Sequence, residues 1–234
     1  MNSLLNVISI DKTGRIVQLD DILAKRASEV TPEVTTQVPE PVPEPVPEPV
    51  DPLNPLGLPL YTIRVRYAEG TTPVFNKGNG VQVSESPNVW DLTYENANWK
   101  GLLETNSATG SNHSKLIEVI GANTTGVTSM EYMFMDDKNL ETLVPFDTSR
   151  VTKMGSFCVF CKKLGAIPLF ATDAVTDVSD AFAYCSNVQS GAYELWQQMS
   201  SQENPPTNTI GCFYECGASD DIPVHDWKEM EFDD

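Results

Sequence analysis

The sequence has few basic residues. Lysine and arginine together number 15 against 33 aspartates and glutamates, and the formal net charge at neutral pH is −18. A nucleic-acid binder must neutralise phosphates with clustered Lys and Arg, and an anionic membrane surface attracts the same side chains. The charge balance therefore argues against nucleic acid and against a membrane surface as partners.

Long apolar runs are also absent. No stretch approaches the roughly 20 apolar residues that a membrane-spanning helix needs. The opening segment, residues 1–11, has no basic residue ahead of its apolar part, and Asn6, Ser9 and Asp11 interrupt that part. A secretory signal needs a basic start and an unbroken apolar stretch. We therefore expect no membrane span, and synthesis in a cytoplasm without export by the ordinary signal route.

Residues 1–30 predict a small anchor segment. Apolar runs at 7–10 and 15–19 flank a glycine-containing turn, which predicts a hairpin, and Asp20 or Asp21 can cap a short helix after it. A segment this small cannot bury enough apolar surface to fold alone, so we expect it to dock on another protein. Packing on the C-terminal part of the same chain is the alternative. The expected anchor residues are Ile8, Ile10, Ile16, Val17, Leu19, Ile22 and Leu23.

Residues 31–59 predict a stalk. Val-Pro-Glu-Pro recurs over 38–50, where proline at alternate positions fixes φ and removes every second N–H donor. Polyproline II rises about 3.1 Å per residue, so Thr31 to Pro55 could span roughly 75 Å. We interpret the segment as a stiff spacer, with a peptide ligand for another domain as the alternative.

A strand-like segment follows the stalk. Residues 61–67 alternate apolar and polar side chains, which predicts a strand with one wet face. Further short apolar segments are separated by Gly, Asn and Ser. We therefore expect a small β-rich cap and a first partial repeat over 60–126.

Residues 127–234 contain a repeat in which position i matches position i + 24. Val127-Thr-Ser-Met130 returns as Val151-Thr-Lys-Met154. A last unit matches at i + 31 instead, and its extra length falls near a helical pattern at 191–202. Periods of about 20–29 residues are typical of leucine-rich repeats, in which stacking covers the apolar face of each unit. The predicted fold class is therefore α+β: a short leucine-rich-repeat-type solenoid with a β-rich N-terminal cap, preceded by a polyproline stalk and a small anchor.

The five cysteines are an odd number, so we expect free thiols. Cys158-x-x-Cys161 and Cys212-x-x-x-Cys216, with Cys185, have spacings that zinc sites use. However, Cys161, Cys185 and Cys216 share one repeat position, and Cys158 occupies the position of a phenylalanine in the neighbouring units. We interpret them as small buried residues and expect no metal.

Other chemistry-bearing residues carry weak signals. His113 and His225 are the two histidines, and neither lies in a nucleophile or metal signature, so we expect no enzymatic activity and no cofactor. We interpret His225-Asp226 as a surface pair. The acidic pairs at 136–137 and 220–221 lack the spacing of a calcium loop and are expected to be solvated. Trp90, Tyr94 and Trp99 could form a sugar platform, although aromatics in a small β-rich cap are more often core.

The repeats and their flanks resemble a known family. Units of the form Val-Thr-x-Met followed by Leu-x-x-(Leu/Ile)-x-x-Phe-x-Thr, with Gly78-Asn-Gly-Val-Gln-Val and Asn88-Val-Trp-Asp-Leu ahead of them, resemble the BspA-like leucine-rich repeat surface proteins. That family occurs in Bacteroides and Mycoplasma surface proteins and in gut bacteriophage structural proteins. The resemblance covers about residues 60–230 and implies adhesion through residues 60–234 to a host-surface glycan or protein.

The resemblance and the stalk lead to one functional expectation. A displayed adhesive domain without a secretion signal suits a bacteriophage virion protein, a capsid-attached head fibre or decoration protein at the virion surface. Residues 1–30 would bind a capsid or other virion protein, and a homo-oligomer at the anchor is expected. A bacterial cell-surface adhesin is the alternative. An intracellular scaffold would fit the thiols but not the long spacer.

Overall fold

The computed structural model describes residues 8–10, 16–18, 51–71, 73, 78–101, 103 and 115–229. The chain divides into two compact units, residues 1–48 and 49–234. In the first unit, strand β1 (Ile8–Ile10) pairs antiparallel with β2 (Ile16–Gln18), and Ile10 lies opposite Ile16. The intervening turn, the expected helix after Asp21 and the Val-Pro-Glu-Pro repeats lie outside the described residues.

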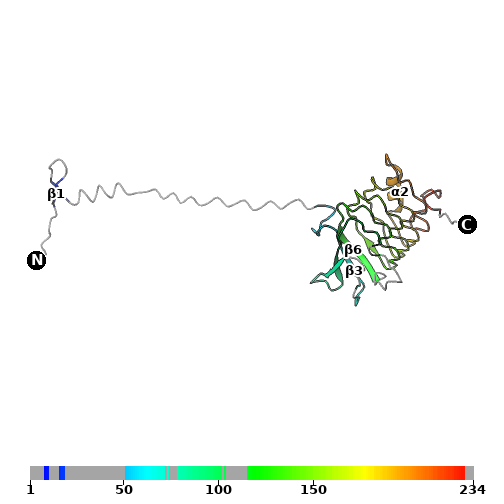
Figure 1. Cartoon of the computed structure of the whole chain (residues 1–234), viewed down its shortest axis with the longest axis horizontal. Helices are drawn as coiled ribbons and strands as arrows, with labels where there is room; N and C mark the ends of the chain where they lie inside the picture. Colours follow the sequence, from blue (N-terminus) through cyan, green and yellow to red (C-terminus); the bar gives the residue numbers. More distant parts are fainter. Residues whose placement is uncertain are drawn as a thin grey trace. The chain divides into compact units, whose positions relative to one another are not determined.

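The second unit begins with a mixed five-stranded sheet in the order β4-β5-β3-β6-β7, and Figure 1 labels two of its strands, β3 and β6. Neighbouring strands are antiparallel except for β6 and β7, which run parallel. The strands are β3 (Thr62–Tyr67), β4 (Asn79–Gln82), β5 (Val89–Thr93), β6 (Leu116–Asn123) and β7 (Thr142–Leu143).

The central strand β3 forms two ion pairs with its neighbours on the face opposite the core. The apolar residues of the alternation, Ile63, Val65 and Tyr67, are buried. Arg64 lies opposite Asp91 on β5 and donates two hydrogen bonds of 2.7 Å to its carboxylate. On the other side, Arg66 lies opposite Glu118 on β6, with Nε 2.7 Å from Oε2. Directly opposed charges of opposite sign favour this pairing.

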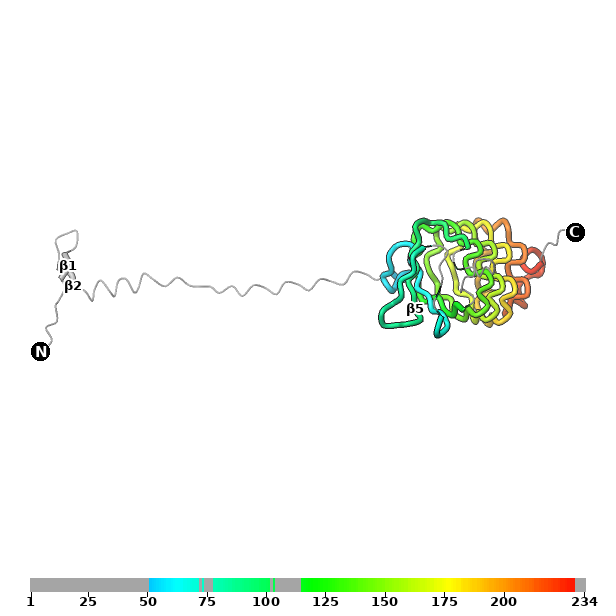
Figure 2. Tube along the Cα trace, turned by 60° about the horizontal axis from the view of Figure 1, so that its bottom comes forward, coloured from blue at the N-terminus to red at the C-terminus, as the bar shows by residue number. Residues whose placement is uncertain are grey.

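Beyond the sheet, the chain forms turn-rich coils that lie side by side in sequence order, from green to red in Figure 2. A row of isolated parallel bridges joins Asn98, Ser129, Lys153, Asp177 and Asn208. The two inner steps of this row have the same offset as Val127 and Val151, and the first and last steps are longer. The repeat in the sequence therefore corresponds to one coil per unit.

Each coil contains two residues with a left-handed backbone, a conformation that costs a non-glycine residue about 1–2 kcal/mol. Hydrogen bonds to the next coil hold them: the N–H of Tyr132 donates to the carbonyl of Gly155, and that of Ser156 to Ser179, at 3.0 and 2.7 Å. The first position is occupied by Tyr132 (φ 57°), Ser156 (54°) and Asp180 (54°), the second by Asp136 (65°), Phe160 (63°) and Tyr184 (59°).

The predicted leucine-rich-repeat-type solenoid is wrong. In the described part of the second unit, the regular secondary structure is the mixed five-stranded sheet and one short helix, α2 (Ala192–Ser200). A leucine-rich repeat unit contributes a strand with a helix or 3₁₀ turn. Residues 144–190, all of which the structure describes, contain only turns and single-residue bridges. The left-handed residues, which interrupt extended backbone twice in every coil, explain the difference.

Helix α2 lies in the longer step between Asp177 and Asn208. Gly191 precedes it with φ 91°, and its N–H donates to Glu194 Oε2 at 3.0 Å. Ala192, Leu195 and Met199 are buried, so one face of the helix packs on the coils. No helix in the described part of the chain is both long and apolar enough to span a bilayer.

A row of aromatic rings fills the interior of the coils. The ring centroids of Phe134 and Phe157 are 5.2 Å apart, those of Phe157 and Phe182 5.9 Å, and those of Phe182 and Phe213 6.0 Å. All four side chains are buried. Ring pairs of this kind contribute about 0.5–1.5 kcal/mol each beyond their buried area. The row therefore joins successive coils through their cores.

The close fit of the coils predicts a strong effect of one methyl group. In Gly217→Ala, the added Cβ would lie 2.2 Å from the carbonyl oxygen of Val188. We expect a loss of about 3 kcal/mol in the free energy of unfolding, measured by chemical denaturation. Gly165→Ala is the control, because its Cβ would lie 3.7 Å from the nearest atom, Glu141 O. Equal stabilities for the two variants would contradict this packing.

Candidate ligand-binding site

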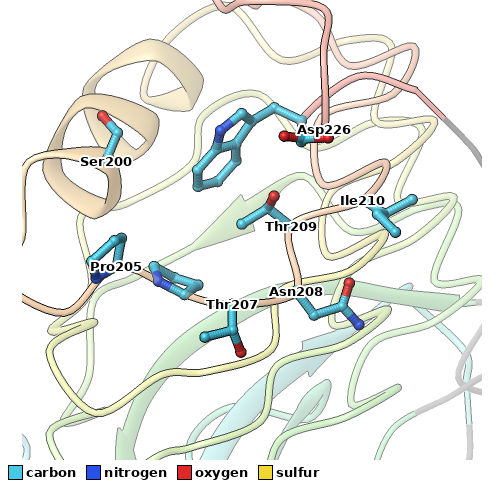
Figure 3. A pocket seen from close by; sticks show the side chains of 9 residues that line it. Ser200, Pro205, Thr207, Asn208, Thr209, Ile210 and Asp226 are labelled. Carbon is cyan, nitrogen blue, oxygen red and sulfur yellow. The ribbon is translucent and has the colours of Figure 1, made fainter.

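A pocket of about 490 Å³ opens where the last coil meets the C-terminal segment. Figure 3 shows Ser200 at the end of α2 on one side, with Thr207, Asn208 and Thr209 on the facing segment and Asp226 above them. Pro205, Pro206, Ile210 and Trp227 complete the lining. The size lies within the ~300–1,000 Å³ of ordinary ligand sites.

The floor of the pocket is fixed to the preceding coil. The N–H groups of Thr207 and Asn208 both donate to the carbonyl of Thr176, at 3.0 and 3.1 Å. Asn208 also forms the last bridge of the row, with Asp177. Pro205 and Pro206 precede this segment, and their rings restrict φ at its entry. The backbone beneath the pocket is therefore attached to the preceding coil by hydrogen bonds.

The wall is formed by a short C-terminal turn. The N–H of Trp227 donates to the carbonyl of His225 at 2.8 Å, and Asp226 between them has φ 66°. This is a γ-turn with a left-handed central residue, which is rare and strained. Trp227 holds the turn in place, because its carbonyl accepts from the N–H of Phe213 at 2.8 Å and the two rings stack with centroids 6.2 Å apart.

The polar side chains of the pocket and its rim differ in the partners that they contact. His225 Nδ1 lies 2.7 Å from Asp226 Oδ1, with both side chains exposed. Two of the lining hydroxyls donate to backbone carbonyls: Ser200 donates to that of Gln197 at 3.3 Å, and Thr207 donates to that of Thr176 at 3.2 Å. These two hydroxyls are therefore held against the backbone and not directed at the imidazole of His225.

A second aromatic feature lies on the outside of the coils. Phe160 and Tyr184 stack with ring centroids 4.6 Å apart and planes at 14°, and Tyr184 meets Tyr214 edge to face at 5.2 Å. Lys162 Nζ lies 5.9 Å from the Phe160 ring centroid. Because the rings cover one another, the row offers edges rather than an open face, and it serves to join neighbouring coils.

All five cysteines are free thiols buried in the coils, as their repeat positions predicted. The Sγ of Cys161 donates to the carbonyl of Phe134 at 3.2 Å, and that of Cys185 donates to Cys158 at 3.1 Å. Burial raises the pKa of the Cys158, Cys161 and Cys212 thiols. No group of three or more His, Cys, Asp or Glu side chains that could hold a metal occurs among the described residues.

The two acidic pairs that were expected to be solvated differ in their burial. Asp220 and Asp221 are exposed. Asp137, in contrast, is fully buried, so the expectation for it is wrong. It occupies the repeat position of Cys161, an interior position of the coil, which explains its burial. Its neighbour Asp136 is half-buried, with Oδ1 3.5 Å from Lys138 Nζ.

The three aromatic residues for which a sugar platform was the alternative lie in or against the core, which was the interpretation that the sequence favoured. Trp99 is fully buried, and its ring lies 5.6 Å from that of Tyr94. Trp90 and Tyr94 are partly buried against the same cluster. His113 lies outside the described residues.

The structure does not place the seven expected anchor residues in a binding site. Ile8 and Ile10 lie in β1, and Ile16 and Val17 in β2, whereas Leu19, Ile22 and Leu23 fall outside the described residues, as do the side chains of all seven. The pocket, by contrast, escaped the sequence reasoning apart from the pair at 225–226. The one feature of the sequence that could have indicated the pocket is the change of the repeat offset in the last unit. Pro205 and Pro206 lie in this longer unit, ahead of an irregular last coil.

Comparisons with known proteins give one match. Residues 105–216, just under half of the chain, match the family described as "Mycoplasma protein of unknown function, DUF285". The match covers most of the coils and ends before the C-terminal turn. Searches of curated proteins and of solved structures give no match.

The environment of Asp180, in the coil beneath the pocket, predicts that replacing this residue with asparagine stabilises the protein in a pH-dependent way. The Asp180 carboxyl is half-buried with Oδ1 unbonded, and burial, with the nearby Asp177 carboxylate, raises its pKa. A raised pKa means that this carboxyl stabilises the fold at low pH and that the contribution is lost as pH rises through the folded-state pKa. Asp180→Asn, which suits the left-handed backbone, should therefore raise the free energy of unfolding at about pH 7 by roughly 0.5–1 kcal/mol.

Denaturant titrations of Asp180→Asn and the unsubstituted protein at two pH values check this. Near pH 3, below the ordinary Asp pKa of about 3.9, the aspartic acid of the unsubstituted protein is neutral, as is the asparagine of the variant. The gain in stability should therefore vanish. A gain that is the same at both pH values would show that the substitution acts through packing or backbone preference instead.

The buried thiols predict resistance to labelling. In the native protein, Ellman's reagent should react with none of the five cysteines over the time in which a free thiol reacts fully, because all are buried and their pKa values are raised. In denaturant all five should react. Rapid reaction of any thiol in the native protein would contradict this burial.

Proposed function

We propose that the protein is a bacteriophage virion structural protein, a capsid-attached head fibre or decoration protein that displays residues 60–234 for attachment to a host surface. The observation that carries the proposal is the division of the chain into a small unit, 1–48, and a large one, 49–234, with the boundary inside the Val-Pro-Glu-Pro repeats at 38–50. A stalk between two units is useful when one of them is fixed and the other must reach outward.

Two further features support display and binding. The chain resembles BspA-like surface proteins over about residues 60–230, in the motifs quoted above. The second unit also carries a pocket lined by polar groups and an aromatic side chain. We propose that the protein binds rather than catalyses, and that oligomerisation at the anchor places several weak sites on one particle, which multiplies their avidity.

A bacterial cell-surface adhesin is the second candidate. The match of residues 105–216 to a family described from Mycoplasma favours it, because that description refers to a bacterial protein. The two candidates share the displayed domain and differ in what the N-terminal unit is attached to.

Substitutions in the paired strands test the anchor. Ile10→Asp with Ile16→Asp places two charges opposite each other in β1 and β2, which should abolish docking on an apolar surface. We expect purified phage particles carrying the variant to lose immunogold label raised against residues 60–234. Ser9→Asp, which adds a charge at the neighbouring strand position, is the control and should keep the label.

The producing cells distinguish the two candidates in the same experiment. Label on particles that is lost only in the double variant supports the virion assignment. Label confined to the cell envelope, with none on particles carrying the unsubstituted protein, would overturn it in favour of the adhesin. Immunoblots of whole cells confirm that each variant accumulates.

A further inference from the structure

We propose that the pocket between α2, residues 205–210 and the Asp226 turn is a binding site for a neutral saccharide. The proposal rests on the proposed attachment function and names the ligand class and the site that would serve it. It draws on four properties of the pocket: its chemistry, its free polar groups, its rigidity and its charge.

The chemistry of the lining matches a pyranose ring, which carries hydroxyls on its rim and apolar C–H groups on its faces. Trp227 supplies a partly exposed aromatic surface, and Pro205 and Pro206 supply apolar walls. Asn208 offers an amide with both donors and an acceptor, Thr209 a hydroxyl, and Asp226 a carboxylate that accepts only. Adjacent hydroxyls of a sugar need this mixture of donors and acceptors within one pocket.

The polar side chains of the pocket differ in whether they already form hydrogen bonds within the protein. Ser200 and Thr207 direct their hydroxyls at backbone carbonyls. The side chains of Asn208 and Thr209, by contrast, make no hydrogen bond to any described residue, although both line the pocket. Asp226 bonds to His225 through Oδ1, which leaves Oδ2 to accept. These three side chains are the ones that a ligand would engage.

The site is held in place before any ligand arrives. Two hydrogen bonds fix the floor to Thr176, and one fixes the wall to Phe213. The γ-turn keeps Asp226 in a strained conformation on the rim, which is a recurrent property of ligand sites. A preformed site loses little conformational entropy on binding, which matters for a ligand that forms few contacts.

The charges around the pocket favour a neutral ligand over an acidic one. Asp226 lies on the rim, and Glu229 Oε2 lies 3.8 Å from His225 Nδ1. The nearest lysine of this segment, Lys228, directs Nζ to the carbonyl of Ser219 at 3.0 Å. The whole chain adds a net charge of −18. Sialic acids and sulfated sugars would therefore be repelled, whereas neutral hexoses and N-acetylhexosamines would not.

Saturation-transfer difference NMR on the full chain tests the site. The probes are methyl glycosides of neutral hexoses and N-acetylhexosamines, with N-acetylneuraminic acid as the acidic comparison, at about 10 mM so that affinities in the mM range are detected. We expect transfer to at least one neutral glycoside and none to the acidic sugar. No transfer to any neutral glycoside, or transfer to the acidic sugar alone, would overturn the proposal.

Two near-isosteric variants locate the binding. Thr209→Val removes one hydroxyl, and Asp226→Asn removes the charge while suiting a left-handed backbone. Each should weaken binding of the responding glycoside about tenfold, as loss of one good hydrogen bond does. The controls are Thr128→Val, three coils earlier at the repeat position of Thr207, and Asp147→Asn, whose amide oxygen can still accept from Ser149 N. Unchanged affinity in both pocket variants would overturn the assignment.

Host-cell binding by the full chain distinguishes a failure of the pocket assignment from a failure of the proposed attachment function. If the chain binds host cells and Thr209→Val and Asp226→Asn bind equally well, the attachment function stands and the pocket assignment fails. If the glycoside binds at the pocket but the chain does not bind host cells, the site stands and the proposed function fails. Binding of a lysine-rich peptide at the pocket in place of every glycoside would also overturn the saccharide assignment.

Discussion

The hydrogen bonds between the backbones of neighbouring coils are the constraint on which the second unit depends. The coils between the sheet and α2 consist of turns, so many of their N–H groups have no partner within the coil. They are satisfied by the next coil: the N–H groups of Met130, Tyr132 and Phe134 donate to the carbonyls of Lys153, Gly155 and Phe157 at 2.8–3.0 Å. Buried backbone groups that lose such partners cost about 1–3 kcal/mol each, so no coil is stable without its neighbour.

This constraint also explains the strained residues. The inter-coil bonds require the chain to turn at two fixed points, and each point takes a left-handed backbone whatever residue stands there, as at Tyr132, Ser156 and Asp180. A helix would satisfy its own backbone, and a strand would satisfy its backbone by pairing with a neighbouring strand, in both cases without left-handed residues. The aromatic row of Phe134, Phe157, Phe182 and Phe213 is the compensating gain.

The left-handed residues also limit what can be predicted from the sequence. The regular offset of the repeat identified which positions are buried, including Cys161 and Cys185, because burial follows the apolar pattern. It did not identify the fold class, because the apolar pattern does not specify the backbone path between buried positions. The left-handed positions are occupied by Tyr, Ser and Asp and not by glycine, so the sequence does not indicate where the backbone becomes left-handed. The pocket was missed for another reason: it forms where the repeat ends, and its lining residues have no counterparts in earlier coils.

An array of this kind must be closed at both ends, and the two closures have different consequences. At the first end, β6 pairs with β7 in parallel and so joins the sheet to the coils. At the other end, the C-terminal turn takes the place of a further coil: Trp227 accepts from Phe213 N, as Cys212 accepts from Phe182 N one coil earlier, and the Trp227 ring extends the aromatic row. Only the inward side of that turn is constrained by stacking. Its outward side chains, Asp226 among them, can change without disturbing any inter-coil bond, so the closing turn is the part of the array best able to acquire a binding specificity of its own.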